Sequence, residues 1–209
     1  MTTLIFIELL LKIHLYYPVG LPSLQDDYPG KKLFFDIRNQ KMSLIESETN
    51  TPWTNFIKET REKFSTIDVQ DASYIPFPSY TLLINLGDIK TNNDRCRKTF
   101  VLNLSLLTNY FTCYFEDVHD FFYDNEKRSN SNVSIVYATT SHDTQDKILL
   151  DAVKSIISRH FPGYKFVAHH LLFNTKISGV TTYTSPELIH HPVLATSIYE
   201  LLFSHEIFV

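Results

Sequence analysis

Two histidine pairs are the first residues in this chain whose types and spacing suggest chemistry. His169 and His170 lie in the segment FVAHHLLF, and a second pair lies in ELIHHPVL. Imidazole nitrogens and carboxylates are common ligands of zinc and other transition metals. A metal-dependent hydrolase is therefore one function that these residues allow. The ligands of such a site would be His170, Glu187, His190 and His191.

The spacing of these residues completes no metal motif. FVAHHLLF is predicted to be a strand, where neighbouring side chains point to opposite faces, so at most one of His169 and His170 faces a given site. Glu187-x-x-His190 matches half of a di-iron motif, but the chain has no second copy of that motif. The zincin pattern His-Glu-x-x-His is also absent. The prediction is therefore that no metal or other cofactor is bound, and the metal-dependent hydrolase is the alternative.

The segment EDVHDFFYDNE is the second candidate, since it gathers five acids and three aromatic rings in eleven residues. Acidic groups speed the encounter with a basic partner, and buried rings supply affinity. The other interpretation is a solvated loop after an edge strand, and the sequence leaves both open. Under the binding hypothesis the contact residues are Glu116, Asp117, Asp120, Phe121, Phe122, Asp124 and Glu126.

The chain carries no motif for nucleotide binding or nucleophilic catalysis. Its five glycines are never closer than ten residues, which removes the dinucleotide fingerprint, the P-loop and the Gly-x-Ser-x-Gly elbow. GDIK places Asp88 two residues before Lys90, as in half of a metal-dependent nuclease core, but the pattern is too short to predict such a site. Cys96 and Cys113 fit no zinc or redox spacing and predict two free thiols. The sequence thus predicts no enzyme activity.

The composition limits the class of partner. The chain of 209 residues has 19 Lys and Arg against 23 Asp and Glu, which gives a net charge of -4. This charge supplies no basic field for phosphate backbones, so nucleic acid is not expected as a partner. The apolar start lacks a basic leading segment and a cleavage site, and Glu8 and Lys12 interrupt it. Neither a signal peptide nor a membrane span is expected, and the expected location is the cytoplasm.

Hydrophobic periodicity predicts helices in the first third of the chain. The first runs to about Tyr17, the second covers residues 31–42, and the third begins at Pro52 with Thr51 as its cap. In the first helix, Glu8 and Lys12 stand four residues apart and predict a narrow solvent stripe on an otherwise buried helix. Whether this helix packs inside the fold or contacts another chain stays open.

The rest of the chain alternates mainly at the period of strands. The predicted strands cover residues 80–86, 98–105, 109–117 and 132–140. Later elements are a helix over 143–160, a strand with the first histidine pair, a short strand over 179–183 and a helix over 192–204. The predicted fold is a single α+β domain over residues 1–209, with a mostly antiparallel sheet and helices from both ends of the chain packed on it. Residues 1–66 form its helical part and residues 79–209 its sheet-rich part.

Three segments, LLKIHLYYPVGLP, PSYTLLINL and LLTNYFTCYFEDV, resemble segments of the immunity proteins of bacterial polymorphic toxin systems. These are small α+β proteins from toxin neighbourhoods. The resemblance implies a cytoplasmic, non-catalytic protein that binds one cognate toxin and blocks its active site. It transfers no site residues, because such families bind through individual surfaces. The leading hypothesis is therefore an immunity protein, and the alternatives are the metal-dependent hydrolase and a structural subunit of a larger assembly.

Overall fold

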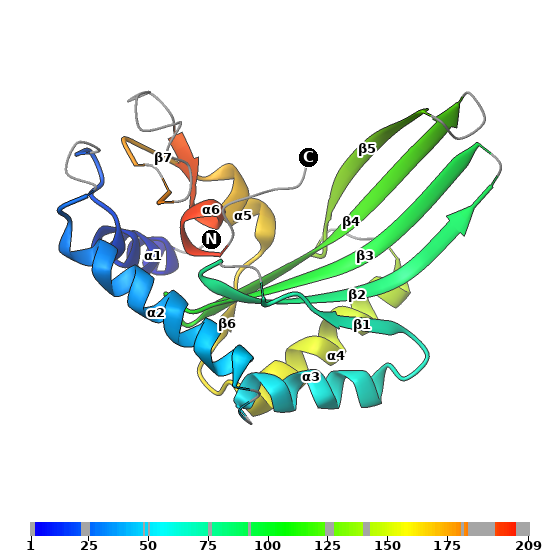
Figure 1. The fold of residues 1–209 in the computed structure, drawn as a ribbon, viewed down its shortest axis with the longest axis horizontal. Coiled ribbons are helices and arrows are strands. Elements are labelled where there is room, and N and C mark those ends of the chain that lie inside the picture. Colours follow the sequence, from blue (N-terminus) through cyan, green and yellow to red (C-terminus); the bar gives the residue numbers. More distant parts are fainter. Residues whose placement is uncertain are drawn as a thin grey trace.

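The computed structural model describes residues 3–21, 26–47, 49, 51–74, 77–91, 93–123, 128–139, 143–180, 182–183 and 195–203. Within these residues, helices from both ends of the chain surround a mostly antiparallel sheet, so the predicted α+β class is confirmed. The N-terminal helices are α1 (Thr3–Tyr16), α2 (Pro29–Glu46) and α3 (Pro52–Lys63). Figure 1 shows them along one end and the lower side of the molecule.

The sheet is a meander of long strands. Its antiparallel strands follow one another in chain order: β1 (Asp68–Asp71), β2 (Ser79–Lys90), β3 (Asp94–Ser105), β4 (Tyr110–Tyr123) and β5 (Arg128–Tyr137). β6 (Lys165–Phe166) pairs with β4 in the parallel sense. The predicted meander is confirmed, but β3 begins at Asp94 rather than residue 98, and β4 continues to Tyr123 rather than residue 117.

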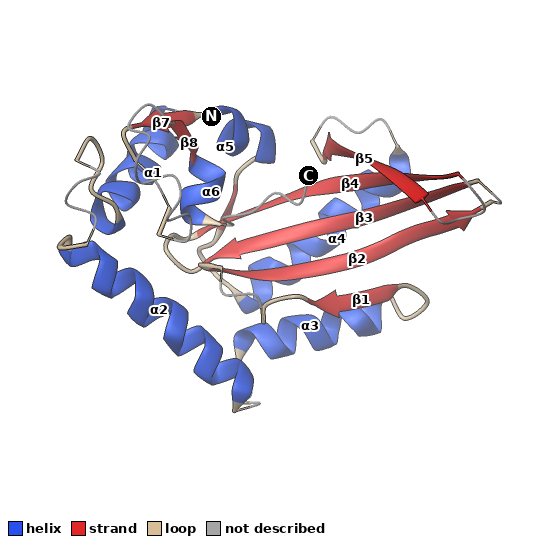
Figure 2. Cartoon of the chain, turned by 45° about the horizontal axis from the view of Figure 1, so that its top comes forward, coloured by secondary structure: helices blue, strands red, loops and turns tan. Residues whose placement is uncertain are grey.

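One hydrophobic core lies between the sheet and the helices α3 and α4 (Thr144–His160). Thr51 begins α3 with a capping box, and the Asp143 side chain accepts a hydrogen bond from the Gln145 amide at the start of α4. Figure 2 shows α4 running under the strands and α3 below β1. The largest fully buried side chains of this core include Phe56, Phe100, Phe115 and Leu82.

A second core joins the near end of the sheet to α1, α2, α5 (His169–Asn174) and α6 (Ile198–Leu202). Hydrogen bonds attach α6 and the residue after it to the sheet: Ser79 Oγ donates to the Phe203 carbonyl at 2.6 Å and Ser105 Oγ donates to the Leu202 carbonyl at 2.7 Å. The Tyr199 hydroxyl also donates to Asn103 Oδ1 at 2.9 Å. This end of the sheet is therefore covered on both faces.

Two predicted strands near the C-terminus are wrong, and the last predicted helix begins later than expected. The first histidine pair begins helix α5 instead of lying in a strand, because an apolar run as short as FVAHHLLF suits either element and Leu172 completes a helical buried face with His169. The described part of the last predicted helix starts only at Ile198, after strand β8 (Ala195–Ser197). Its partner β7 (Lys176–Ser178) precedes the predicted short strand, and Gly179 instead adopts a φ of 72° in a turn.

Helix α1 also differs from the prediction. It buries only Leu9, Ile13 and Tyr16, and most of its other aliphatic side chains are partly or fully exposed. The narrow solvent stripe expected around Glu8 and Lys12 is thus a broad outer face. None of the helices in the described part of the chain is long and apolar enough to cross a membrane.

Candidate partner-binding arm

The far ends of four strands extend beyond the helices. We call residues 87–90, 94–98, 117–123 and 128–134 the arm, and the rest of the sheet the base. Figures 1 and 2 show the arm rising past the ends of α3 and α4. Because a strand rises about 3.3 Å per residue, the arm portion of β4 spans roughly 20 Å. Beyond Lys98, which still contacts α4, the arm is thus a sheet whose two faces are not covered by described helices.

Strand alternation gives the arm two distinct faces. Lys98 Nζ lies 2.8 Å from Asp146 Oδ1 on α4, so Lys98 marks the face that continues the helix side of the base. Its cross-strand partner Asp117 shares that face. We call this side the aromatic face, after its exposed rings, and the opposite side the polar face.

A β-bulge changes which side chains reach the polar face. The pairing of β2 with β3 shifts by one residue between Asn85 and Gly87. Without this shift, Asn85 and Gly87 would share a face and Asp88 would point toward the helices. The bulge instead places Asp88 opposite Arg97 and on the same face as Asn85.

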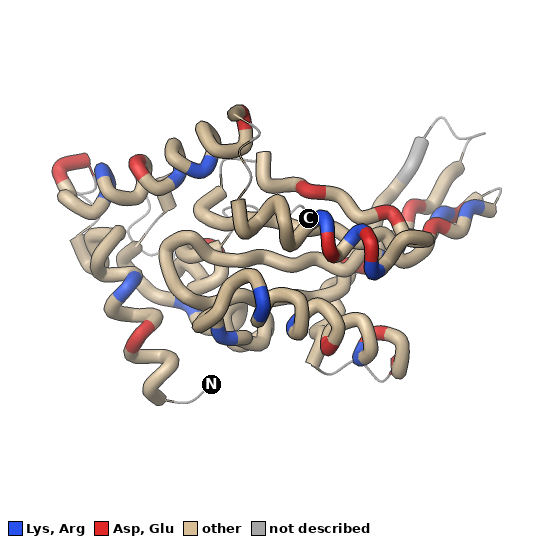
Figure 3. The backbone as a smooth tube through the Cα atoms, turned by 90° about the horizontal axis from the view of Figure 1, so that it is seen from below, with Lys and Arg blue, Asp and Glu red and all other residues tan. Residues whose placement is uncertain are grey.

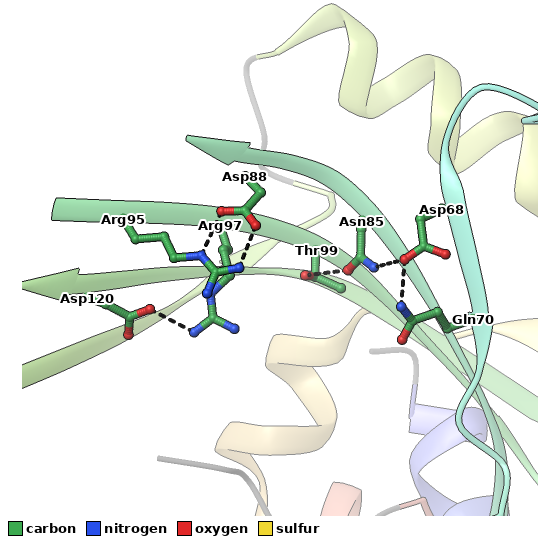
Figure 4. Close-up of polar contacts among 8 residues, drawn as sticks. All are labelled: Asp68, Gln70, Asn85, Asp88, Arg95, Arg97, Thr99 and Asp120. Atoms are coloured by element: carbon green, nitrogen blue, oxygen red, sulfur yellow. Dashed lines mark hydrogen bonds and ion pairs between the residues drawn. The ribbon is translucent and has the colours of Figure 1, made fainter. Parts of the chain in front are cut away.

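Two ion pairs hold the polar face together, as Figure 4 shows. Arg95 donates through Nε and Nη2 to the two carboxylate oxygens of Asp88, at 2.8 and 2.6 Å. Asp120 accepts from Arg97 Nη2 at 2.9 Å and from the Ser131 hydroxyl at 2.7 Å. These contacts lower the pKa of both carboxyl groups, chiefly through Arg95 for Asp88 and through Ser131 for Asp120.

A depression of about 460 Å³ lies beside these ion pairs, toward the edge strand β1. Asp68 accepts hydrogen bonds from Asn85 at 2.5 Å and from Gln70 at 2.6 Å within it. The second acid that lines this depression, Asp88, is already bound by Arg95. Among the described residues, no group of three or more His, Cys, Asp or Glu is placed to hold a metal ion.

The aromatic face carries large apolar side chains that meet solvent. Ile89 is 69% exposed, Phe121 48% and Tyr123 52%. Between them, Cys96 Sγ lies 3.7 Å from His119 Nε2. Figure 3 shows that acidic and basic residues alternate along the arm, whereas the middle of the molecule carries few charges. The arm therefore combines exposed apolar groups with a mixed charge pattern.

The residues of the EDVHDFFYDNE segment do not form one patch. Asp117 and Phe121 lie on the aromatic face, whereas Asp120 and Phe122 lie on the polar face. Asp120 is buried and already holds Arg97 and Ser131. Asp124 and Glu126 lie outside the described residues.

Glu116, the first acid of that segment, lies on the polar side at the junction of base and arm. Its carboxyl group is half-buried between Thr99 and Ile135 on the neighbouring strands. Burial raises its pKa, and the nearby Arg97 opposes that shift. Residues 116–123 of the segment therefore belong to an inner strand of the sheet with β5 beyond it, and not to a loop after an edge strand.

The histidine hypothesis is only partly visible in the structure. Glu187, His190 and His191 lie outside the described residues, and His170 is on α5. His169 is buried, with its ring centroid 4.2 Å from that of Tyr114 and 4.6 Å from that of Tyr199. Burial lowers the pKa of His169 to about 4, and His170 adds to the effect, so His169 is uncharged at neutral pH.

Sequence reasoning missed Ile89, Arg95 and Arg97 as members of the arm. Asp and, to a lesser degree, Lys are depleted in strands, so DRCRK does not look like the beginning of one. The available signal was the spacing of Arg95 and Arg97, because residues two apart share a face of any strand. The signal for the bulge that turns Asp88 toward them was Gly87, because an isolated glycine within a strand often marks a bulge.

Comparison with known proteins supplies no relative. No family model, curated protein or solved structure matches this chain. The geometry of the arm and the resemblance of three segments to immunity proteins are therefore the supports for a functional proposal.

Proposed function

We propose that this protein is a non-catalytic binding module that holds one protein partner against the aromatic face of its arm. The observation that carries the proposal is the joint exposure of Ile89, Phe121 and Tyr123 on one face of the sheet. Exposed apolar groups that share a face mark interaction sites, and aromatic side chains dominate the energy of many interfaces. Their β-strand backbone is already ordered, so binding requires little additional ordering of the main chain.

The ion pairs of the polar face, on the opposite side of the sheet, support partner binding by the aromatic face. The Arg97–Asp120 pair links β3 to β4, and Ser131 extends the contact to β5. Arg95 and Asp88 join β3 to β2 in the same way. These cross-strand contacts keep the rings of the aromatic face in fixed relative positions, which favours a partner with a complementary apolar surface.

The partner we propose is a toxin domain, and the protein acts as its immunity protein. This step rests on the resemblance of LLKIHLYYPVGLP, PSYTLLINL and LLTNYFTCYFEDV to immunity proteins. An immunity protein acts by occupying a surface of the toxin, and a protruding arm is suited to reach into an active-site cleft. The acidic and basic groups of the arm would set the orientation of the encounter.

The proposal is tested by capture of the partner with a tagged protein from lysate of the native organism. The test variant is Phe121→Thr with Tyr123→Thr, because threonine preserves strand propensity while removing both rings. The matched control is Leu33→Gln with Ile148→Gln, which removes two exposed apolar side chains from α2 and α4. We expect the wild-type protein and the control to retain one stoichiometric partner and the arm variant to lose it.

Expression of the captured partner then tests the toxin assignment. A toxin should stop growth when expressed alone, and the wild-type protein, but not the arm variant, should restore it. Equal capture by the arm variant would remove the aromatic face from the proposal. Stoichiometric zinc or manganese in a purified sample without a protein partner would instead favour the metal-dependent hydrolase with His170, Glu187, His190 and His191.

A further inference from the structure

The outer face of α1 is an apolar stripe that no described part of the chain covers. Leu4 is 65% exposed, Ile7 48%, Leu11 65% and Leu15 45%. Their spacing of three, four and four residues keeps them on one side of a helix. The opposite side packs into the second core through Leu9, Ile13 and Tyr16. The helix is thus apolar on two faces, and only one of them has a partner.

We propose that a second copy of this chain covers the stripe, through antiparallel pairing of two α1 helices about a two-fold axis. A two-fold contact requires a surface that is complementary to itself. The stripe satisfies this condition, because its midpoint lies between residues 9 and 10. Leu4 and Leu15 lie equally far from that midpoint, and Ile7 and Leu11 nearly so. Antiparallel pairing therefore sets Leu4 against Leu15 and Ile7 against Leu11 of the second copy.

Charge complementarity supports the same arrangement. Glu8 and Lys12 lie on one edge of the stripe, on either side of its midpoint. In an antiparallel pair the equivalent edges of the two helices face each other, which brings Glu8 near Lys12 of the second copy twice. Among the described residues, no ion-pair partner of Lys12 is present within the chain. Glu8 is held in place because it accepts a hydrogen bond from the Tyr110 hydroxyl, and its only ion-pair partner among the described residues, Lys165 Nζ, lies at the long distance of 3.9 Å, so its charge is only weakly satisfied within the chain.

A depression beside this edge adds room for the contact. It has a volume of about 440 Å³ and is lined by Leu11, Lys12, Tyr110 and Lys165, among others. A stable dimer buries on the order of 800 Å² on each partner, which is more than a stripe of four side chains supplies. Side chains that flank the stripe of the second helix would enter this depression and enlarge the contact. We expect a dimer whose population depends on protein concentration.

This inference is independent of the arm. α1 lies at the end of the molecule opposite the arm, as Figure 1 shows, so a dimer through α1 leaves both arms accessible. Loss of dimerisation and loss of the toxin partner are therefore separate results. The variant Leu11→Lys should still capture the partner, and the Phe121→Thr and Tyr123→Thr variant should still dimerise.

Sedimentation equilibrium over a wide range of protein concentration tests the dimer. The wild-type mass should rise from 24.4 kDa toward twice that value. Leu11→Lys should remain at the mass of one chain, because a charge would enter the centre of the contact. Ile148→Lys, an equally drastic change at an exposed site on α4, should behave as wild type. A wild-type protein that stays monomeric, or a Leu11→Lys protein that still dimerises, would overturn the proposal.

Disulfide formation tests the antiparallel geometry, in a background where Cys96→Ser removes the partly exposed native thiol. A mixture of Leu4→Cys and Leu15→Cys chains should form a mixed disulfide, because these positions lie level with each other. Each chain alone should not, because equivalent positions would be about 16 Å apart along the axis and a disulfide spans less than about 7 Å between Cα atoms. The reverse pattern would indicate parallel helices and contradict the two-fold contact proposed here.

Discussion

The base and the arm are built from the same strands and differ in what covers them. In β3, Phe100 and Leu102 are fully buried in the core beneath the sheet, whereas Arg95 and Arg97, only a few residues earlier, are partly exposed. The base is held by two hydrophobic cores, and the arm by backbone pairing and cross-strand ion pairs. The contrast indicates that the two cores supply most of the stability, which leaves the exposed side chains of the arm free for the partner binding proposed above.

Removal of one aromatic ring from each region should give the largest difference in the free energy of unfolding. Phe100 is fully buried, with its ring centroid 5.3 Å from that of Phe115, so Phe100→Ala should lower the free energy of unfolding by about 3 to 5 kcal/mol. Phe121→Ala on the arm should change it by no more than about 0.5 kcal/mol. Urea denaturation of both variants measures the two effects. Similar losses would show that the arm packs against something that stabilises it.

A buried charge on α2 contacts the beginning of the base and predicts an unusual pH dependence. Lys41 on α2 donates to the carbonyls of Phe77 at 2.9 Å and Ser79 at 3.1 Å. Burial lowers its pKa from 10.5 to about 8, with Arg38 adding to the shift and Asp71 opposing it. The folded protein therefore binds fewer protons than the unfolded chain between these values, and its stability should rise with pH across that window.

The full gain should approach roughly 3 kcal/mol, since one pKa unit corresponds to about 1.4 kcal/mol. The penalty is fully present below pH 8 and is relieved as the pH approaches 10.5. Unfolding free energies of the wild type and Lys41→Met should be measured at several pH values from neutral upward. We expect the wild type to gain stability relative to the variant, and parallel curves would contradict a buried ammonium group at this site.

Two acids on the polar side of the sheet, one on the arm and one at its junction with the base, should respond to pH in opposite directions. Asp120→Asn should lower the free energy of unfolding by about 1 to 2 kcal/mol at neutral pH, because it removes the charge from the contact with Arg97. The pKa of Asp120 is lowered in the folded state, so its contribution is present above about pH 4 and is lost as the pH falls.

Glu116→Gln is the matched control, since burial raises the pKa of Glu116. The ionised form of Glu116 is disfavoured in the folded state, so this variant should equal or exceed the wild type in stability at neutral pH. As the pH falls, the wild type should approach Asp120→Asn in stability and lose any deficit relative to Glu116→Gln. Chemical denaturation at neutral and acidic pH measures both differences. Identical pH dependence of the two variants would mean that the environments of the two acids do not differ as described.

The base was largely predictable from the sequence, and the arm was not. A strand was correctly predicted over residues 109–117, where Phe111, Cys113 and Phe115 lie in the core, and Thr51 marked the start of α3. These patterns arise from burial and capping, which leave periodic signals. In the arm, side chains on both faces meet solvent, so no hydrophobic period marks the strands and their ends were missed. Its ion pairs depend on register and on the bulge at Asn85, which are set by the fold as a whole.

The smallest expected change in the free energy of unfolding concerns the second ion pair of the polar face. Asp88 and Arg95 have better geometry than Asp120 and Arg97, with two contacts of 2.8 and 2.6 Å, but both of their side chains are well exposed. Exposed pairs are screened by water and salt, so Asp88→Asn should leave the free energy of unfolding unchanged within error. A double-mutant cycle with Arg95→Gln, followed by chemical denaturation at low and high salt, measures the coupling directly. A coupling as large as that between Arg97 and Asp120 would show that the polar face acts as one network, in which contact geometry outweighs burial.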